Sequence, residues 1–230
     1  MEALGARIDL GPEAVGACID EAGFGFMFAP AHHQATRFVM PVRRELAVRT
    51  IFNLLGPLTN PAGASRQLIG VSDARFQTNI AGALACLGAE RALVVCSEAG
   101  LDEISTAAPT KVVEVNGEEL DSYTLTPAEV GVPMLSGAAL ETDCAGGTPE
   151  QNAAVTTAIL QPDGSSPESS ASIDLALINA GAAIYVAGRA ETIADGVQAA
   201  RAALADGSAA GALERYVRFS QAHAPAQVAR

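Results

Sequence analysis

The sequence has few aromatic residues, few basic residues and few cysteines. Only 4% of its 230 residues are aromatic and none is tryptophan, so a core must be built from alanine, valine, leucine and isoleucine. No CxxC pair occurs, and the spacing predicts buried, reduced thiols for the four cysteines, Cys18, Cys86, Cys96 and Cys144. No stretch is apolar over the ~20 residues that a membrane helix needs, and residues 1–5 lack the pattern of a secretory leader. We therefore expect a cytoplasmic protein without a membrane partner.

Basic residues are outnumbered by acidic ones, 14 to 26, which gives a formal net charge of −12. A general nucleic-acid-binding surface needs many cations, so this balance argues against nucleic acid as a partner. Hydrophobic residues make up 49% of the chain, which excludes intrinsic disorder for most of it. We expect one α/β domain over residues 1–222, followed by a frayed tail at 223–230.

The hydrophobic pattern predicts strands followed by helices. The strand–helix–strand order over residues 67–97 implies a parallel pair, and Asn116-Gly117 is typical of a hairpin turn. The Pro-, Gly- and Ser-rich stretch at 162–170 predicts a surface loop. Strands are expected at 25–29, 67–72, 92–97, 111–115 and 120–125, and helices at 12–22, 74–87, 150–160, 173–187, 192–205 and 209–222.

The most basic part of the sequence lies between Ala31 and Arg66. It contains a single acid, Glu45, together with the pair His32-His33 and five arginines, Arg37, Arg43, Arg44, Arg49 and Arg66. Because a guanidinium binds carboxylate or phosphate through two parallel hydrogen bonds, this window could bind an anionic small molecule. It could equally be a solvated helix face with ordinary salt bridges, and charge alone does not decide between the two.

Asp102 and Glu103 follow the strand predicted at 92–97. Ligands of open α/β sheets lie beyond the carboxyl ends of the strands, and two adjacent carboxylates there can hold Mg²⁺ while phosphates complete its shell. Paired acids are also common in ordinary loops. A zinc site is not expected, because His32 and His33 have no third ligand at metal spacing. The sequence contains no GxGxxG, Walker A or GxSxG motif.

Four segments in this order resemble the anthranilate phosphoribosyltransferase family of tryptophan biosynthesis. They are FAPAHHQATRFVMPVRREL at Phe28–Leu46, RTIFNLLGPLTNPAGA at Arg49–Ala64, GLDEIS at Gly100–Ser105 and NAGAAIYVAG at Asn179–Gly188. The resemblance runs from Met1 to about Phe219. It implies a mixed, mainly parallel sheet flanked by helices, of the nucleoside phosphorylase/phosphoribosyltransferase C-terminal domain type.

The resemblance also implies a glycosyl transfer from phosphoribosyl pyrophosphate to the amine of anthranilate. In the family an arginine contacts the anthranilate carboxylate, and the matching residue here is Arg43. His33 matches the histidine that lines the anthranilate pocket, and Gly56 and Pro57 match the loop that closes it. No residue is predicted to act as a catalytic acid, base or nucleophile, because positioning and neutralisation of the leaving group supply most of the rate.

The metal motif of the family matches Asp102 and Glu103, which would hold Mg²⁺ on the pyrophosphate. Three features of the family are absent from this chain: an N-terminal helical domain, a glycine-rich GTGGD loop and a KHGNR segment. The chain therefore resembles the C-terminal two-thirds of the enzyme. The homodimer contacts of the family are made largely by the absent domain.

Two other functions compete with this interpretation. A non-catalytic module on the same fold, binding nucleic acid or a protein partner, would explain the absent glycine-rich loop, but the charge of −12 opposes it. A pyrimidine nucleoside phosphorylase relative would need a basic phosphate and base site, which the sequence does not show.

Overall fold

The computed structural model describes residues 1–32, 55–136, 144–160 and 171–223. The predicted loop at 162–170 and the tail beyond 223 lie outside the described residues. Contacts between Cα atoms divide the chain into two compact units. The first comprises Met1–Arg49, Gly146–Asp163 and Leu204–Arg230, and the second Thr50–Ala145 and Gly164–Ala203. The single domain expected over 1–222 stays a prediction.

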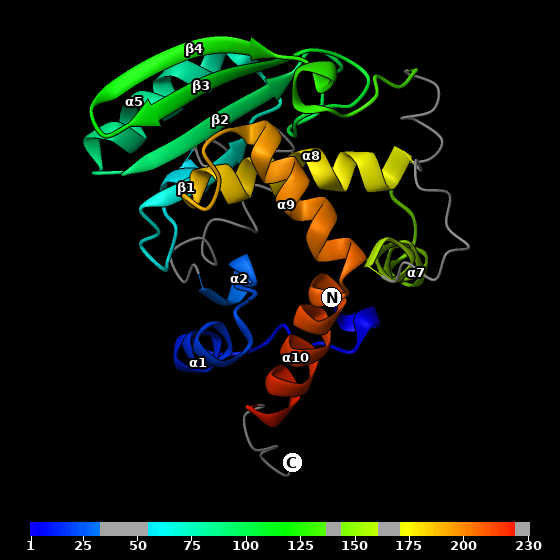
Figure 1. Cartoon of the computed structure of the whole chain (residues 1–230). Coiled ribbons are helices and arrows are strands. Elements are labelled where there is room, and N and C mark those ends of the chain that lie inside the picture. The colour runs from blue at the N-terminus through cyan, green and yellow to red at the C-terminus, as the bar shows by residue number, and fades with distance from the viewer. Residues whose placement is uncertain (33–54, 137–143, 161–170, 224–230) are drawn as a thin grey trace, which may run out of the picture. The chain divides into compact units, whose positions relative to one another are not determined.

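The second unit is built on a four-stranded sheet (Figure 1). Strands β1 and β2 pair in parallel, whereas β2–β3 and β3–β4 are antiparallel. The mixed sheet is thus confirmed, although among the described strands its parallel share is smaller than predicted. The strands lie in the order β1 (Arg66–Gly70), β2 (Arg91–Ser97), β3 (Thr110–Asn116) and β4 (Glu119–Leu125).

Helices cover both faces of this sheet (Figure 1). On one face Val94 of β2 packs with Leu84 of α5 (Gln77–Cys86), which follows the short 3₁₀ turn η3 (Ala74–Phe76). On the other face Leu93 packs with Ile178 of α8 (Ala171–Val186) and with α9 (Ile193–Ala205). Because successive side chains of β2 point to opposite faces and both faces are covered, all five residues from Ala92 to Cys96 are apolar and buried.

Helices α8 and α9 approach each other through two glycines. A Cβ atom built on Gly196 of α9 would lie 2.1 Å from the carbonyl oxygen of Gly181 in α8. A Cβ atom on Gly181 would lie 2.6 Å from the amide nitrogen of Val197. The backbones are therefore in direct contact at this crossing, and no larger residue fits there without moving a helix.

A carboxylate joins α8 to the sheet. Tyr185 of α8 donates a hydrogen bond to Glu114 Oε1 over 2.7 Å, and Tyr123 of β4 donates to Oε2 over 3.1 Å. Burial and the neighbouring Glu114 charge raise the pKa of both tyrosine hydroxyls, so they remain protonated donors. The predicted hairpin, which carries Glu114 and Tyr123, is confirmed, with Gly117 in the left-handed region at φ 61°.

The first unit is helical in its described residues. A buried tyrosine, Tyr216 of α10, packs with Leu10, Val15 and Cys18, and its hydroxyl donates to the Arg7 carbonyl over 3.2 Å. The helices of this unit are η1 (Glu2–Leu4), α1 (Pro12–Ala22), α2 (Ala29–His32), α7 (Pro149–Leu160) and α10 (Ser208–Ala222).

The strand predicted at residues 25–29 is wrong. Phe26 and Met27 pack against the α1–α10 cluster, and Ala29 begins α2. A short apolar run fits a buried strand and a buried connection equally well, and only its neighbours decide between them. In contrast, α1 spans the predicted residues and ends before Gly23, whose φ of 77° is the left-handed stop that the sequence indicated.

None of the four cysteines forms a disulfide, and all four are described. Cys18 and Cys96 are buried as predicted, but Cys86 is exposed, because it lies in the last turn of α5 beyond the part that packs on the sheet. Of the helices in the described ranges, none combines the length and the apolar character required to cross a bilayer.

One buried acid gives a pH-dependent prediction. Asp174 is 1% exposed, its Oδ2 has no hydrogen-bond partner among the residues that the structure describes, and Arg201 Nη2 lies 3.8 Å from Oδ1. Burial raises the pKa of Asp174, so the folded chain binds this proton more tightly than the unfolded chain. The free energy of unfolding therefore falls as pH rises from about 4, the unfolded value, through the raised pKa.

Asp174→Asn is expected to remove the loss of stability that comes from burying an ionised carboxylate at this position. Its Tm at pH 7 should exceed that of the parent by roughly 2–4 °C for each kcal/mol regained, and the difference should vanish below about pH 4. Thermal unfolding followed by circular dichroism at several pH values measures this, with the exposed Asp20→Asn as the control. A less stable Asp174→Asn at pH 7 would show that the Arg201 pair outweighs desolvation.

Candidate functional site

A tight turn follows the carboxyl end of β2 in the second unit. The amide of Ser97, the last residue of β2, donates to the Leu101 carbonyl over 3.0 Å, and the Ser97 hydroxyl oxygen accepts from the Ala99 amide over 3.0 Å. Gly100 takes a left-handed φ of 84°, which reverses the chain. The turn therefore delivers the next two residues, Asp102 and Glu103, at the carboxyl edge of the sheet.

The end of β1 fixes the position of Asp102. A Cβ atom built on Gly70, the last residue of β1, would lie 1.5 Å from the Asp102 carbonyl oxygen. The Asp102 peptide thus occupies the space that a side chain at position 70 would take. Because β1 and β2 are parallel, their carboxyl ends share this edge, where α/β sheets bind ligands.

The chain is anchored again directly after the carboxylate pair. The Ile104 side chain is fully buried among Ile178 and Ala182 of α8. Its amide donates to Asn179 Oδ1 over 2.9 Å, and its carbonyl accepts from Asn179 Nδ2 over 2.9 Å. The Ser105 amide then donates to the Thr110 hydroxyl oxygen. Asp102 and Glu103 therefore project from a backbone that is held on both sides.

Both carboxylates of the pair are exposed, and no described residue forms a hydrogen bond or an ion pair with either side chain. No group of three His, Cys, Asp or Glu side chains with metal-binding geometry occurs in the described ranges. Two adjacent oxygen donors fit Mg²⁺, which takes one or two carboxylates and completes its shell with water and phosphate oxygens. They do not fit zinc, which needs three or four protein ligands.

The other predicted site residues are not brought to this turn by the described contacts. His33 and Arg43 lie outside the described residues. Gly56 and Pro57 open the 3₁₀ turn η2 (Gly56–Leu58), and no hydrogen bond joins the backbone of η2 to the Asp102–Glu103 turn. Leu58 lines a small pocket with residues near the start of β1 and the end of α5, at the other end of the parallel strands from the carboxylate turn. The anthranilate-site roles thus stay predictions.

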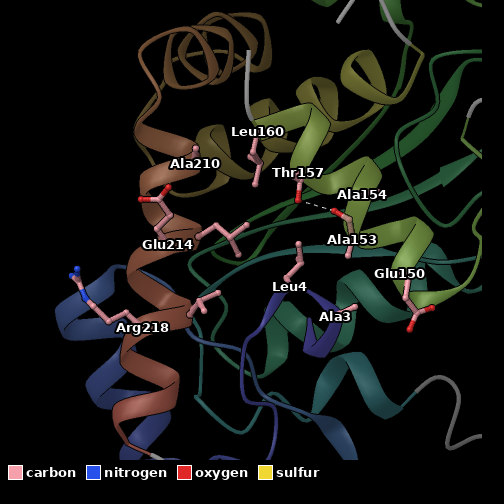
Figure 2. A pocket seen from close by; sticks show the side chains of 12 residues that line it. Ala3, Leu4, Glu150, Ala153, Ala154, Thr157, Leu160, Ala210, Glu214 and Arg218 are labelled. Atoms are coloured by element: carbon pink, nitrogen blue, oxygen red, sulfur yellow. Dashed lines mark hydrogen bonds between the residues drawn. The ribbon is translucent and has the colours of Figure 1, made fainter. Parts of the chain in front are cut away.

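The first unit contains a pocket of about 630 Å³ (Figure 2). The charged groups of Glu150, Glu214 and Arg218 point away from its interior in Figure 2, and the rest of the lining is mainly apolar. A mainly apolar lining does not indicate a site for a metal ion or a phosphate. The lining residues are Ala3, Leu4, Glu150, Ala153, Ala154, Thr157, Leu160, Ala210, Leu213, Glu214, Val217 and Arg218.

Sequence reasoning missed the two residues that shape the carboxylate turn, Gly70 and Asn179. Each left a signal in the sequence. Gly70 interrupts an apolar strand near its end, which is typical of a close backbone approach. Asn179 is the polar residue in the otherwise apolar run Leu175–Gly188, where a buried amide needs partners. Neither signal identifies the partner segment.

Comparison with known proteins agrees with this geometry. The profile of the glycosyl transferase family, a/b domain, matches residues 1–210, and the chain belongs to this family. It is 51% identical over 221 residues to the anthranilate phosphoribosyltransferase of Rubrobacter xylanophilus, covering 96% of this chain and 62% of that relative. The anthranilate phosphoribosyltransferase of Maricaulis maris is 46% identical, again covering 96% of this chain and 62% of that relative. The chain thus spans about 62% of the length of these curated relatives.

Solved structures share the fold. The crystal structure of anthranilate phosphoribosyltransferase from Thermus thermophilus is 45% identical, with a TM-score of 0.85 over 96% of this chain and 63% of that chain. A structure of the Saccharomyces cerevisiae enzyme in complex with PRPP and Mg has the same TM-score, 0.85, at 24% identity, over 96% of this chain and 61% of that chain. The predicted resemblance and fold type are therefore confirmed.

Proposed function

We propose that this chain is the α/β part of an anthranilate phosphoribosyltransferase, which transfers the phosphoribosyl group of phosphoribosyl pyrophosphate to the amine of anthranilate. One observation supports this most directly. Two exposed carboxylates, Asp102 and Glu103, stand on a fixed turn at the carboxyl edge of the sheet, and none of the described residues pairs with them. The chain that carries them is 51% identical to a curated enzyme of that name.

In the proposed reaction the anthranilate nitrogen forms a bond to C1 of the ribose as the C1–oxygen bond to pyrophosphate breaks. Positive charge develops on the ribose and negative charge on the leaving group, so electrostatic stabilisation and alignment supply most of the rate. Mg²⁺, when bound, neutralises the pyrophosphate. Asp102 and Glu103 would hold that ion through their carboxylates, and after the bond has formed the nitrogen loses its proton to water.

The anthranilate side of the proposal rests on the family resemblance. Arg43 would bind the anthranilate carboxylate, His33 would line its pocket, and Gly56 and Pro57 would belong to the loop that closes over it. A cytoplasmic location and the homodimer of the family belong to the same proposal. A binding module for nucleic acid is not favoured, because the net charge is −12 and no observation supports it.

The double variant Asp102→Asn, Glu103→Gln tests the metal role. The chain is mixed with the remaining segment of the Rubrobacter xylanophilus relative, and phosphoribosyl pyrophosphate is titrated calorimetrically with and without Mg²⁺. We expect Mg²⁺ to strengthen binding to the parent, and the double variant to lose this gain by a factor of more than about ten, because both ion ligands are gone.

Glu98→Gln is the matched control, since Glu98 is an exposed acid of the same turn that is assigned no ligand role. It should leave the Mg²⁺ dependence unchanged. An equal loss in Glu98→Gln would mean that net charge rather than coordination matters. Binding by the parent without any Mg²⁺ dependence would refute the proposal.

A further inference from the structure

We infer that Asn179 is a positioning residue, whose side-chain amide sets the place and direction of the Asp102–Glu103 carboxylates. The inference rests on the proposed function, because those carboxylates bind a divalent ion only under that proposal. Asn179 lies in α8, 75 positions along the chain from Ile104, and touches the turn through hydrogen bonds rather than through the ion.

The side-chain amide of Asn179 makes three hydrogen bonds. Its Oδ1 accepts from the Ile104 amide over 2.9 Å, and its Nδ2 donates both to the Ile104 carbonyl and to the Leu175 carbonyl, each over 2.9 Å. Rotating the amide by 180° would place donor against donor and acceptor against acceptor at Ile104. The network therefore admits a single orientation, and it fixes the peptide groups on both sides of Ile104.

These bonds act on the residue next to the carboxylates. Ile104 follows Glu103 directly, and its side chain is 0% exposed in the core between the sheet and α8. The upstream support of the turn is the Asp102 backbone against Gly70. With Asp102 fixed by β1 and Ile104 fixed by α8, the directions of the Asp102 and Glu103 side chains follow from the backbone.

A substitution at Asn179 affects the turn through the hydrogen bonds that it removes from Ile104. Leucine has a similar volume, but it would leave the buried amide and carbonyl of Ile104 without partners. Aspartate keeps the shape and can accept from the Ile104 amide, yet it cannot donate to the Ile104 carbonyl. We therefore expect Asn179→Leu to remove both of the bonds that hold Ile104 and Asn179→Asp to remove only the bond to the Ile104 carbonyl.

The first unit offers a matched control. Asn152 makes the same pair of bonds to a single residue: its Oδ1 accepts from the Gly147 amide over 2.8 Å, and its Nδ2 donates to the Gly147 carbonyl over 3.3 Å. Asn152→Leu removes an equivalent amide from a loop to which no ion-binding role is assigned. It should alter neither the Ile104 amide nor the binding of a divalent ion at Asp102 and Glu103.

Nuclear magnetic resonance on the intact chain supplies two readouts. The rate of hydrogen exchange of the Ile104 amide measures how firmly Asn179 holds that amide. A Mn²⁺ titration measures ion binding by the two carboxylates through paramagnetic broadening of the Glu103 amide signal. In Asn179→Leu we expect exchange at Ile104 to accelerate at least about tenfold, and half-broadening of Glu103 to need about tenfold more Mn²⁺, the usual effect of losing a group that orients a metal ligand.

Four outcomes would overturn the inference. Unchanged exchange at Ile104 in Asn179→Leu would show that the amide does not hold the turn. Faster exchange with unchanged Mn²⁺ broadening would reduce Asn179 to a structural contact. Absence of Mn²⁺ broadening at Glu103 in the parent, or broadening that persists in Asp102→Asn, Glu103→Gln, would refute the proposed metal role itself and with it the inference.

Discussion

Replacing Gly196 by alanine is expected to destabilise the second unit, although alanine is the better helix former. The new Cβ would lie 2.1 Å from the Gly181 carbonyl oxygen, and its nearest neighbours are backbone atoms that cannot rotate away. Helices α8 and α9 must therefore separate, which opens the packing around Val197 and Ile178. Overpacking of this kind costs about 1–3 kcal/mol, which lowers the Tm of a chain of this length by several degrees.

Gly82→Ala in α5 is the control, because a Cβ at position 82 meets no atom within 4 Å. There the propensity gain of up to about 1 kcal/mol should appear as a higher stability. Urea unfolding of both variants measures the contrast. Stabilisation of both by similar amounts would mean that the α8–α9 contact is looser than the structure indicates.

Local elements were predictable from the sequence because their causes are local. The end of α1 follows from Gly23, and the hairpin follows from Asn116-Gly117 between the strand-like segments 111–115 and 120–125. The β1–α5–β2 unit follows from the change between strand and helix periodicity. The run at residues 25–29 has no such signal, and the packing of Phe26 and Met27 against α1 and α10 depends on residues almost 200 positions away.

The candidate site divides in the same way. That Asp102 and Glu103 follow a buried strand was predictable from the sequence, together with the expectation of a divalent ion at that edge. Their orientation was not, because it depends on Gly70 and Asn179, which lie 32 and 77 positions from Asp102 in the sequence and contact the turn only after folding. A pattern records that a residue type is unusual in its place, but it does not record what that residue contacts.

The contact at Gly70 leads to the most direct test of the site that leaves every proposed ligand in place. In Gly70→Ala the new Cβ would coincide with the Asp102 carbonyl, 1.5 Å away. Gly70 is paired with Val95 of β2, so the end of β1 cannot move away from the turn without losing hydrogen bonds to β2. The turn must yield instead, by roughly 2 Å before ordinary van der Waals contact is restored.

Displacement of that size should separate the carboxylates from the ion. We expect Gly70→Ala to weaken Mg²⁺-dependent binding of phosphoribosyl pyrophosphate by a factor of about 100, since misplacement by about 1 Å can already have that effect on a reacting group. A stability loss of about 1–3 kcal/mol should accompany it.

Ile69→Val separates the two effects. It removes one methylene from the buried residue next to Gly70, costs about 0.5–1.5 kcal/mol and adds nothing near Asp102. Calorimetric titration at a temperature where both variants are folded should therefore show normal Mg²⁺ dependence in Ile69→Val and a large loss in Gly70→Ala. Normal Mg²⁺ dependence in a folded Gly70→Ala would mean that the turn binds the ion equally well when displaced, and that the place of the carboxylates is not set by the end of β1.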